Sequence, residues 1–245
     1  MDTIKSLFVW MFIILAMTIL FPVSFILWLL LYPFDHERAA IHWWLVIEGC
    51  LLTKLIPIWK ISVEGREKAI RKTPYVIISN HQSILDILIM NCLRCRFRWI
   101  SKIENSKVPF LGRYMRMAKY IAVERGNKES KAEMMVKAAE SLRNGISVMM
   151  FPEGTRSPDR EIAPFKLGAF QLAIMTDKSI LPVIIDGTGG VLPKHSLIFT
   201  KNNILKIKVL DPVHPGSFGT GDPEELASKF RKLMVDELIK MRAGK

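Results

Sequence analysis

Cysteine is scarce in this sequence, which holds only three cysteines in 245 residues. A small disulfide-stabilised domain would need a larger, paired set, so we expect the thiols to be reduced. Cys92 and Cys95 form one C-x-x-C pair, but no second pair accompanies them, and a structural zinc site needs four ligands. The cysteine content therefore argues against a disulfide framework and against structural zinc.

Two further patterns are missing from the chain. The G-x-S-x-G sequence that carries the nucleophile of many hydrolases does not occur, so Ser83 or Ser157 would have to serve without its usual setting. There is also no internal repeat and no low-complexity segment, which excludes a repeat architecture. A hydrolase is thus a weak interpretation of this sequence.

Charged residues are absent from Ser6 to Phe34. This apolar run is long enough to cross a bilayer as one helix, with a kink expected at Pro22. A cleaved signal peptide fits poorly, because the run is too long, Lys5 is the only basic residue before it, and no small-residue cleavage site follows. We therefore expect a membrane segment at this position.

A second apolar segment, Ile41 to Trp59, contains Glu48 and Lys54, which favours an amphipathic helix in the membrane interface over a spanning helix. Two arrangements are open: a spanning helix followed by a surface helix, or a helical hairpin that dips into one leaflet. We expect residues 1–60 to form an N-terminal membrane anchor of one or two helices, and residues 61–245 to form a separate domain. Because that domain is rich in Lys and Arg, the positive-inside tendency places it on the cytoplasmic side of the inner membrane.

Acidic residues are outnumbered, with 23 Asp and Glu against 35 Lys and Arg and a formal net charge of +12. Such an excess calls for an anionic partner. Beside an apolar anchor, anionic membrane lipids and phosphorylated ligands are simpler partners than nucleic acid. One stretch opposed only by Glu104 and Glu124 is either a candidate anion-binding strip or a solvated basic face; it comprises Arg94, Arg96, Arg98, Lys102, Lys107, Arg113, Arg116, Lys119 and Arg125.

Strand-like and helix-like patterns alternate after the anchor. Strands are expected at 61–65, 75–79, 97–102, 120–125, 146–154, 180–187 and 204–213, and helices at 84–93, 107–119, 129–143, 164–177 and from Pro223, with Asp222 as the N-cap of the last one. This order predicts the α/β class, with a mixed, largely parallel sheet flanked by helices. Ligands are expected at the carboxyl ends of the strands.

The stretch "SNHQSILD" places His81 at the junction of a strand and a helix, five residues before Asp86. On one regular helix the two side chains would point about 140° apart. If the helix begins near Gln82 or Ser83, His81 precedes it and can fold back, so that Asp86 accepts the Nδ1 hydrogen and leaves Nε2 as a base. A capping histidine beside an unrelated aspartate is the alternative for this stretch alone.

Two other strand ends carry polar chemistry. Arg125 leaves a strand in "IAVERGN" and is suited to bidentate phosphate contact, although such an arginine is more often simply exposed. The stretch "FPEGTRS" combines Glu153, Gly154, Thr155 and Arg156, in which glycine lets backbone N–H groups approach an anion. A surface turn held by its own Glu and Arg is the alternative. Three strand ends with polar side chains in one predicted sheet favour a binding or catalytic site over unrelated surface turns.

"NHQSILD" resembles the N-H-x4-D motif, and "FPEGTRS" the matching second motif, of the 1-acylglycerol-3-phosphate O-acyltransferase family, about seventy residues apart. The similarity also covers "SKIENSKVPFLG", "PFKLGAF" and "ILPVI", and extends from about Ile61 to Val213. The resemblance implies a glycerol-3-phosphate acyltransferase-like fold and a membrane-associated enzyme of phospholipid synthesis. It also implies that no cofactor and no metal is required, since the nucleophile is a hydroxyl of the substrate.

The same resemblance implies roles for individual residues. His81 would be the general base and Asp86 would orient the imidazole and stabilise the imidazolium. Lysophosphatidate would be acylated to phosphatidic acid by acyl-coenzyme A or acyl carrier protein, although another lyso-lipid acceptor and a non-enzymatic basic membrane adaptor are open alternatives. The implied substrate-binding residues are Glu153, Gly154, Thr155 and Arg156, with Arg125 and Lys102 on the phosphate of the acceptor.

Overall fold

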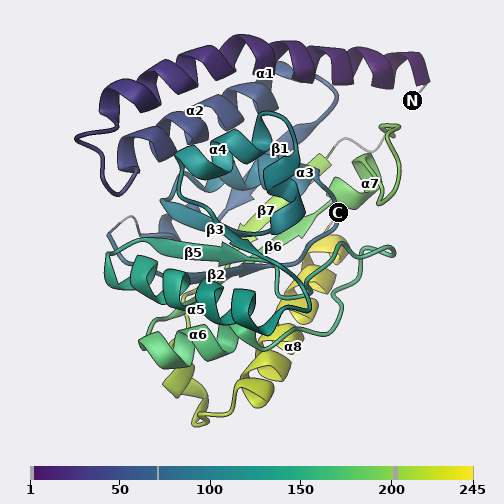
Figure 1. Cartoon of the computed structure of the whole chain (residues 1–245). Coiled ribbons are helices and arrows are strands. Elements are labelled where there is room, and N and C mark those ends of the chain that lie inside the picture. The colour runs from purple at the N-terminus through teal and green to yellow at the C-terminus, as the bar shows by residue number, and fades with distance from the viewer. Residues whose placement is uncertain (1–2, 71, 201–203, 245) are drawn as a thin grey trace.

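A computed structural model describes residues 3–70, 72–200 and 204–244. Within them the chain forms a seven-stranded sheet with helices on both faces (Figure 1). The strands are β1 Lys60–Glu64, β2 Val76–Ser79, β3 Phe97–Lys102, β4 Ile121–Val123, β5 Ser147–Met150, β6 Ile180–Asp186 and β7 Ile204–Val209. The helices are α1 Thr3–Leu31, α2 Ala39–Leu55, α3 Leu85–Ile89, α4 Leu111–Met117, α5 Lys128–Arg143, α6 Gly168–Thr176, α7 Thr188–Val191 and α8 Pro223–Ala243.

The strand order is β1-β7-β6-β2-β5-β3-β4. Only β6 and β7 pair in antiparallel fashion, and every other described neighbour pair is parallel. The prediction of a mixed, largely parallel α/β sheet flanked by helices is therefore confirmed. In the central pair, Ile78 of β2 lies opposite Met150 of β5. Because the two strands run in parallel and in this register, the turns that follow them leave the sheet side by side.

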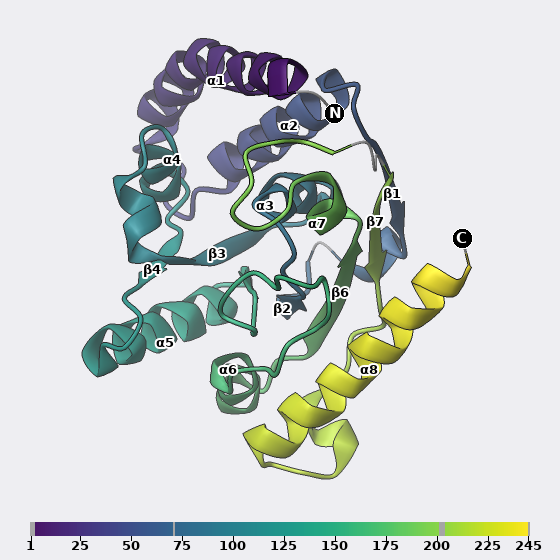
Figure 2. The same cartoon turned by 90° about the vertical axis from the view of Figure 1, so that its right-hand side faces the viewer.

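Both faces of the sheet are covered, which explains why its central strands are apolar without interruption. Along β2, Ile77 points into one core with Leu85 and Ile89 of α3. Val76 and Ile78 point into the opposite core, which α5, α6 and α8 complete. Figure 2 shows these three helices on one side of the sheet, and α1, α2, α3 and α4 on the other.

The two N-terminal helices lie together on the second of these faces. The 29-residue helix α1 is long and apolar enough to cross a membrane, and little of it is buried. Glu48 of α2 does not form part of a solvent-facing stripe, because it is only 6% exposed. Its carboxylate accepts hydrogen bonds from Ser24 of α1 at 2.7 Å and from Tyr114 of α4 at 2.6 Å. The acidic residue that indicated an amphipathic surface helix thus joins three helices.

Several element boundaries differ from the expected ones. The helix expected over 84–93 is the short α3 followed by a 3-10 turn, Met90–Leu93. In this turn the side-chain amide of Asn91 donates to the carbonyls of Ile87 and Leu88, and such bonds compete with regular helical ones. The last helix begins as expected, since the side chain of Asp222 accepts from the backbone N–H of Glu224 and Pro223 follows it.

Candidate active site

His81 and Asp86 meet directly after β2. His81 Nδ1 lies 2.7 Å from Asp86 Oδ2, and the same oxygen accepts from the backbone N–H groups of Gln82 at 2.7 Å and Ser83 at 2.9 Å. Asp86 is fully buried. These contacts identify Oδ2 as an acceptor, so Nδ1 carries the proton and Nε2 is the basic nitrogen of the ring. The segment between them is not helical, because α3 begins only at Leu85.

The imidazole of His81 lies flat on the ring of Phe151, the first residue after β5. The ring centroids are 3.9 Å apart and the planes differ by 7°. Phe151 in turn contacts the indole of Trp99 on β3, at 5.4 Å between centroids. Only 15% of the His81 side chain is exposed. The hydrogen bond to Asp86 and this stacking together hold the base in one orientation.

Glu153, in the turn after β5, connects this turn with the turn after β2 that carries His81. Its Oε1 accepts from the backbone N–H of His81 at 2.7 Å, and its Oε2 accepts from the N–H of Ala163 at 3.0 Å. The backbone N–H of Ser157 also donates to the carbonyl of His81 at 2.8 Å. Burial raises the pKa of Glu153 to about 7, although the two backbone bonds act in the opposite direction. The carboxylate therefore positions the turn that carries His81, and Glu153 is not among the residues that line the cavity described next.

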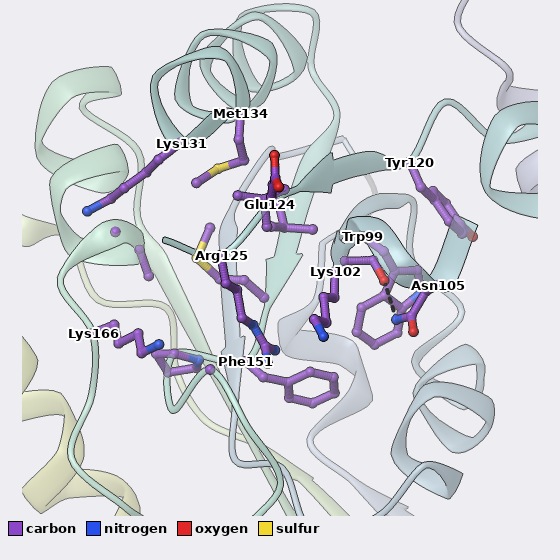
Figure 3. A pocket seen from close by; sticks show the side chains of 18 of the residues that line it. Trp99, Lys102, Asn105, Tyr120, Glu124, Arg125, Lys131, Met134, Phe151 and Lys166 are labelled. Atoms are coloured by element: carbon purple, nitrogen blue, oxygen red, sulfur yellow. Dashed lines mark hydrogen bonds between the residues drawn. The ribbon is translucent and has the colours of Figure 1, made fainter. Parts of the chain in front are cut away.

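A cavity of about 480 Å³ opens beside His81 (Figure 3). Aromatic and aliphatic side chains line it, Trp99, Tyr120 and Met115 among them. Five basic side chains and one acidic side chain also line it: Lys102, Arg125, Lys128, Lys131, Lys166 and Glu124. Such a cavity matches an amphiphilic ligand with an anionic headgroup.

Gly154 and Lys166 are neighbours in the lining of the cavity. Gly154 has a φ of +73°, and a Cβ placed on it would lie 2.8 Å from both Cε and Nζ of Lys166. The glycine thus leaves room for the lysine to lie across the turn. Sequence reasoning missed Lys166 as a site residue, and its only signal was its place in "PFKLGAF".

The structure divides the predicted site residues into three groups. His81, Lys102, Arg125 and Gly154 line one cavity. Asp86 and Glu153 are buried behind it. Thr155 is exposed, and neither it nor Arg156 lines the cavity; the backbone carbonyl of Arg156 accepts from Lys194 at 2.7 Å.

The basic strip expected between residues 94 and 125 does not form one surface, so that interpretation was wrong. Arg98 is buried and pairs with Glu37 at 2.6 Å, and Arg96 donates to the backbone carbonyl of Glu37 at 2.6 Å. Lys102 and Arg125 reach the cavity, where Lys102 also pairs with Glu104 at 2.8 Å. The expected strip is divided because its residues lie on different elements, from the turn after α3 through β3 and α4 to the turn after β4.

Comparison with known proteins gives a consistent result. A family model described as Acyltransferase matches residues 60–186. The chloroplastic 1-acyl-sn-glycerol-3-phosphate acyltransferase LPAT1 of Arabidopsis thaliana is 33% identical over 182 residues, which cover 74% of this chain and 51% of that protein. The chain thus spans about half the length of this relative.

A bacterial relative is covered more fully. The 1-acyl-sn-glycerol-3-phosphate acyltransferase of Salmonella typhimurium is 29% identical over 198 residues, or 79% of each chain. The crystal structure of the 1-acyl-sn-glycerophosphate (LPA) acyltransferase PlsC from Thermotoga maritima superposes with a TM-score of 0.79 at 25% identity, and the match covers 99% of this chain and 98% of that one.

Proposed function

The chain belongs to the acyltransferase family, and we propose that it transfers a fatty acyl group from an acyl thioester to the free hydroxyl of 1-acylglycerol-3-phosphate, giving phosphatidic acid. The observation that carries this proposal is the position of the His81 and Asp86 pair at the wall of a cavity that is both basic and apolar. The names of the Arabidopsis, Salmonella and Thermotoga relatives support the same reaction.

His81 acts as the general base. Its Nε2 takes the proton of the acceptor hydroxyl while the hydroxyl oxygen attacks the thioester carbonyl. The new C–O bond forms, the C–S bond breaks, and the thiolate leaves and receives the proton back from the imidazolium. Asp86, held by two backbone N–H groups, stabilises that imidazolium without leaving its place. General-base catalysis of this kind contributes roughly 10²–10⁴-fold.

The basic side chains of the cavity bind the phosphate of the acceptor. Arg125 offers a planar pair of N–H donors, and Lys102 and Lys166 add positive charge from β3 and from the segment before α6 (Figure 3). The apolar walls formed by Trp99 and Tyr120 suit an acyl chain. A single cavity can therefore hold both parts of a lysophosphatidate.

The proposal extends to the acyl donor and to the membrane on which the chain works. Acyl-coenzyme A and acyl carrier protein both present a phosphopantetheine thioester, and the basic side chains that line the cavity suit the phosphate of either one. The apolar α1 exposes large side chains such as Phe8, Ile14 and Leu29, which supports insertion of residues 1–60 into a membrane of anionic lipids. The rest of the chain then works at its cytoplasmic surface, where lysophospholipids are within reach.

A second acceptor class is supported by one feature of the cavity. Glu124 lines it beside Arg125, and the side chain of Asn127 donates to Glu124 Oε2 at 3.0 Å. A carboxylate at this position would attract a cationic headgroup. The same catalytic pair could then acylate a lyso-lipid that carries an amine.

The test uses the full chain purified in detergent. Labelled acyl-coenzyme A and acyl carrier protein donors are each offered with lysophosphatidate and with a panel of other lyso-lipids, and His81→Ala serves as the control. Transfer to lysophosphatidate that is lost in the variant would support the proposal. Transfer only to an amine-bearing lyso-lipid would replace the acceptor, and the absence of any transfer that depends on His81 would overturn the enzymatic proposal.

A further inference from the structure

A second cavity of about 280 Å³ lies at the carboxyl end of α2. Its walls come from α2, from β1, from the 3-10 turn Arg66–Lys68 and from the turn after α3. None of its lining residues lines the cavity beside His81. The mechanism above makes no use of it.

Three cations from three separate elements surround this second cavity. Lys54 comes from the last turn of α2, Arg66 from the 3-10 turn after β1, and Arg94 from the end of the turn after α3. No Asp or Glu is among the lining residues, and Glu64 at the end of β1 pairs with Lys208 at 3.3 Å. The positive charge of the cavity is thus not neutralised by any carboxylate in its walls.

Arg66 shows the lack of an acceptor most directly. Its Nε is buried and has no hydrogen-bond partner among the described residues. A buried N–H donor without an acceptor is unfavourable, and buried polar groups are nearly always paired in folded proteins. A ligand with several acceptor oxygens would supply what the protein does not.

Two thiols form part of the wall of the second cavity. Cys50 of α2 and Cys92 both line the cavity, and Cys50 Sγ lies 3.4 Å from the carbonyl of Asn91. Cys50 therefore lies where a ligand bound in this cavity would cover it.

We propose that this second cavity is an anion site that takes a phosphate-bearing group, either the headgroup of an anionic lipid or a free phosphate. Its volume is at the lower limit of ligand pockets, about 300 Å³, so a headgroup fits and a whole lipid does not. Two guanidinium groups and one ammonium match the several oxygens of a phosphate better than a single carboxylate. The position at the end of α2, which packs on the apolar α1, places the cavity where lipid headgroups would lie.

Cys50 provides a local probe for the test. The full chain in detergent is labelled with N-ethylmaleimide, and the rate at Cys50 is followed by peptide mass spectrometry in inorganic phosphate and in sodium chloride of equal ionic strength. The chain is also reconstituted into vesicles of phosphatidylglycerol or of phosphatidylcholine. Because a bound anion covers Cys50, we expect labelling to slow at least about threefold with the anionic ligand.

Arg66→Gln and Arg94→Gln are the test variants, and Lys60→Gln is the matched control, because Lys60 is exposed on β1 and does not line the cavity. Protection lost in the two arginine variants and kept in the control supports the site. Protection by phosphate identifies the phosphate group itself as sufficient, and protection by phosphatidylglycerol vesicles alone identifies a lipid headgroup. Equal labelling rates in all conditions, or protection that persists in both arginine variants, would overturn the proposal.

A second measurement covers the case in which Cys50 reacts too slowly to follow. Phosphate that binds only the folded chain raises its unfolding temperature. The part of this increase that Arg66→Gln removes and Lys60→Gln keeps belongs to the second cavity. If both variants respond to phosphate as the unmodified chain does, the cavity is not a phosphate site.

Discussion

The backbone N–H of His81 donates to Oε1 of Glu153 at 2.7 Å, although 72 residues separate the two in the chain. This bond exists because Ile78 and Met150 lie opposite each other in the sheet. His81 comes three residues after Ile78, and Glu153 comes three residues after Met150. The turn that carries the base is therefore braced by the turn of the second motif. The carboxylate of Glu153 acts on the catalytic pair through the backbone.

Glu153 should make the stability of the fold depend on pH. Its pKa in the folded chain is raised to about 7, whereas in an unfolded chain it would titrate near its ordinary value of 4.5. Between these values the folded state holds a proton on Glu153 that the unfolded state has lost, so the contribution of Glu153 to stability should fall as pH rises from about 4.5 to 7 and then level off.

Chemical denaturation of the wild type and of Glu153→Gln at a series of pH values measures this effect. Glutamine cannot titrate, and every other titrating group is common to the two proteins, so the difference between their free energies of unfolding isolates Glu153. This difference, wild type minus variant, should fall by roughly 3 kcal/mol over the range. A difference that instead increases with pH would show that the backbone bonds outweigh burial.

Substitution of either His81 or Asp86 should lower the acyltransferase activity. His81→Ala should lower kcat/KM by roughly 10²–10⁴-fold, because no base remains beside the cavity. Asp86→Asn should cause a comparable loss, since an amide can present a donor to Nδ1 and favour the wrong tautomer. His214→Ala is the matched control, because His214 pairs with Asp177 and does not line the cavity. Comparable losses at His81 and His214 would contradict the assignment.

Arg125 should act on the acceptor and not on the chemical step. Arg125→Ala removes charge-assisted hydrogen bonds to a phosphate, which are worth roughly 1.5–3 kcal/mol, so KM for lysophosphatidate should rise about 10–100-fold with a smaller change in kcat. Arg116→Ala, at an exposed position of α4 outside the cavity, should leave both constants unchanged. An unaltered KM in Arg125→Ala would place the phosphate elsewhere, or point to an acceptor without an accessible phosphate.

Gly154 and Gly145 form a matched pair for testing the approach of Lys166. Both have positive φ, at +73° and +74°, but a Cβ on Gly154 would meet Lys166, whereas a Cβ on Gly145, which does not line the cavity, would have open space around it. The two alanine variants therefore carry the same kind of backbone strain. Gly154→Ala should lose more acyltransferase activity than Gly145→Ala, because it also displaces the lysine. Equal kcat/KM values in the two variants would show that the position of Lys166 does not matter.

Elements with a strong local pattern were predictable from the sequence, and their ends were less so. The alternation of apolar strands and helices predicted the largely parallel sheet, because each run is buried on both faces. The helix expected from residue 107 begins only at Leu111, after Phe110 adopts a φ of +60° that no sequence pattern announced. No local sequence pattern indicated that β7 would be the strand that pairs in antiparallel fashion with β6.

The sequence by itself determined the α/β pattern, the long apolar N-terminal helix and the pair of His81 and Asp86, which are close in the chain and need only a short turn to meet. The tertiary structure alone decided which distant side chains join them. The stacking on Phe151, the brace of Glu153, the approach of Lys166 and the burial of Arg98 all follow from sheet register and helix packing. The physical reason is that short-range backbone preferences act within a few residues, whereas contacts across the chain depend on how the whole core is packed.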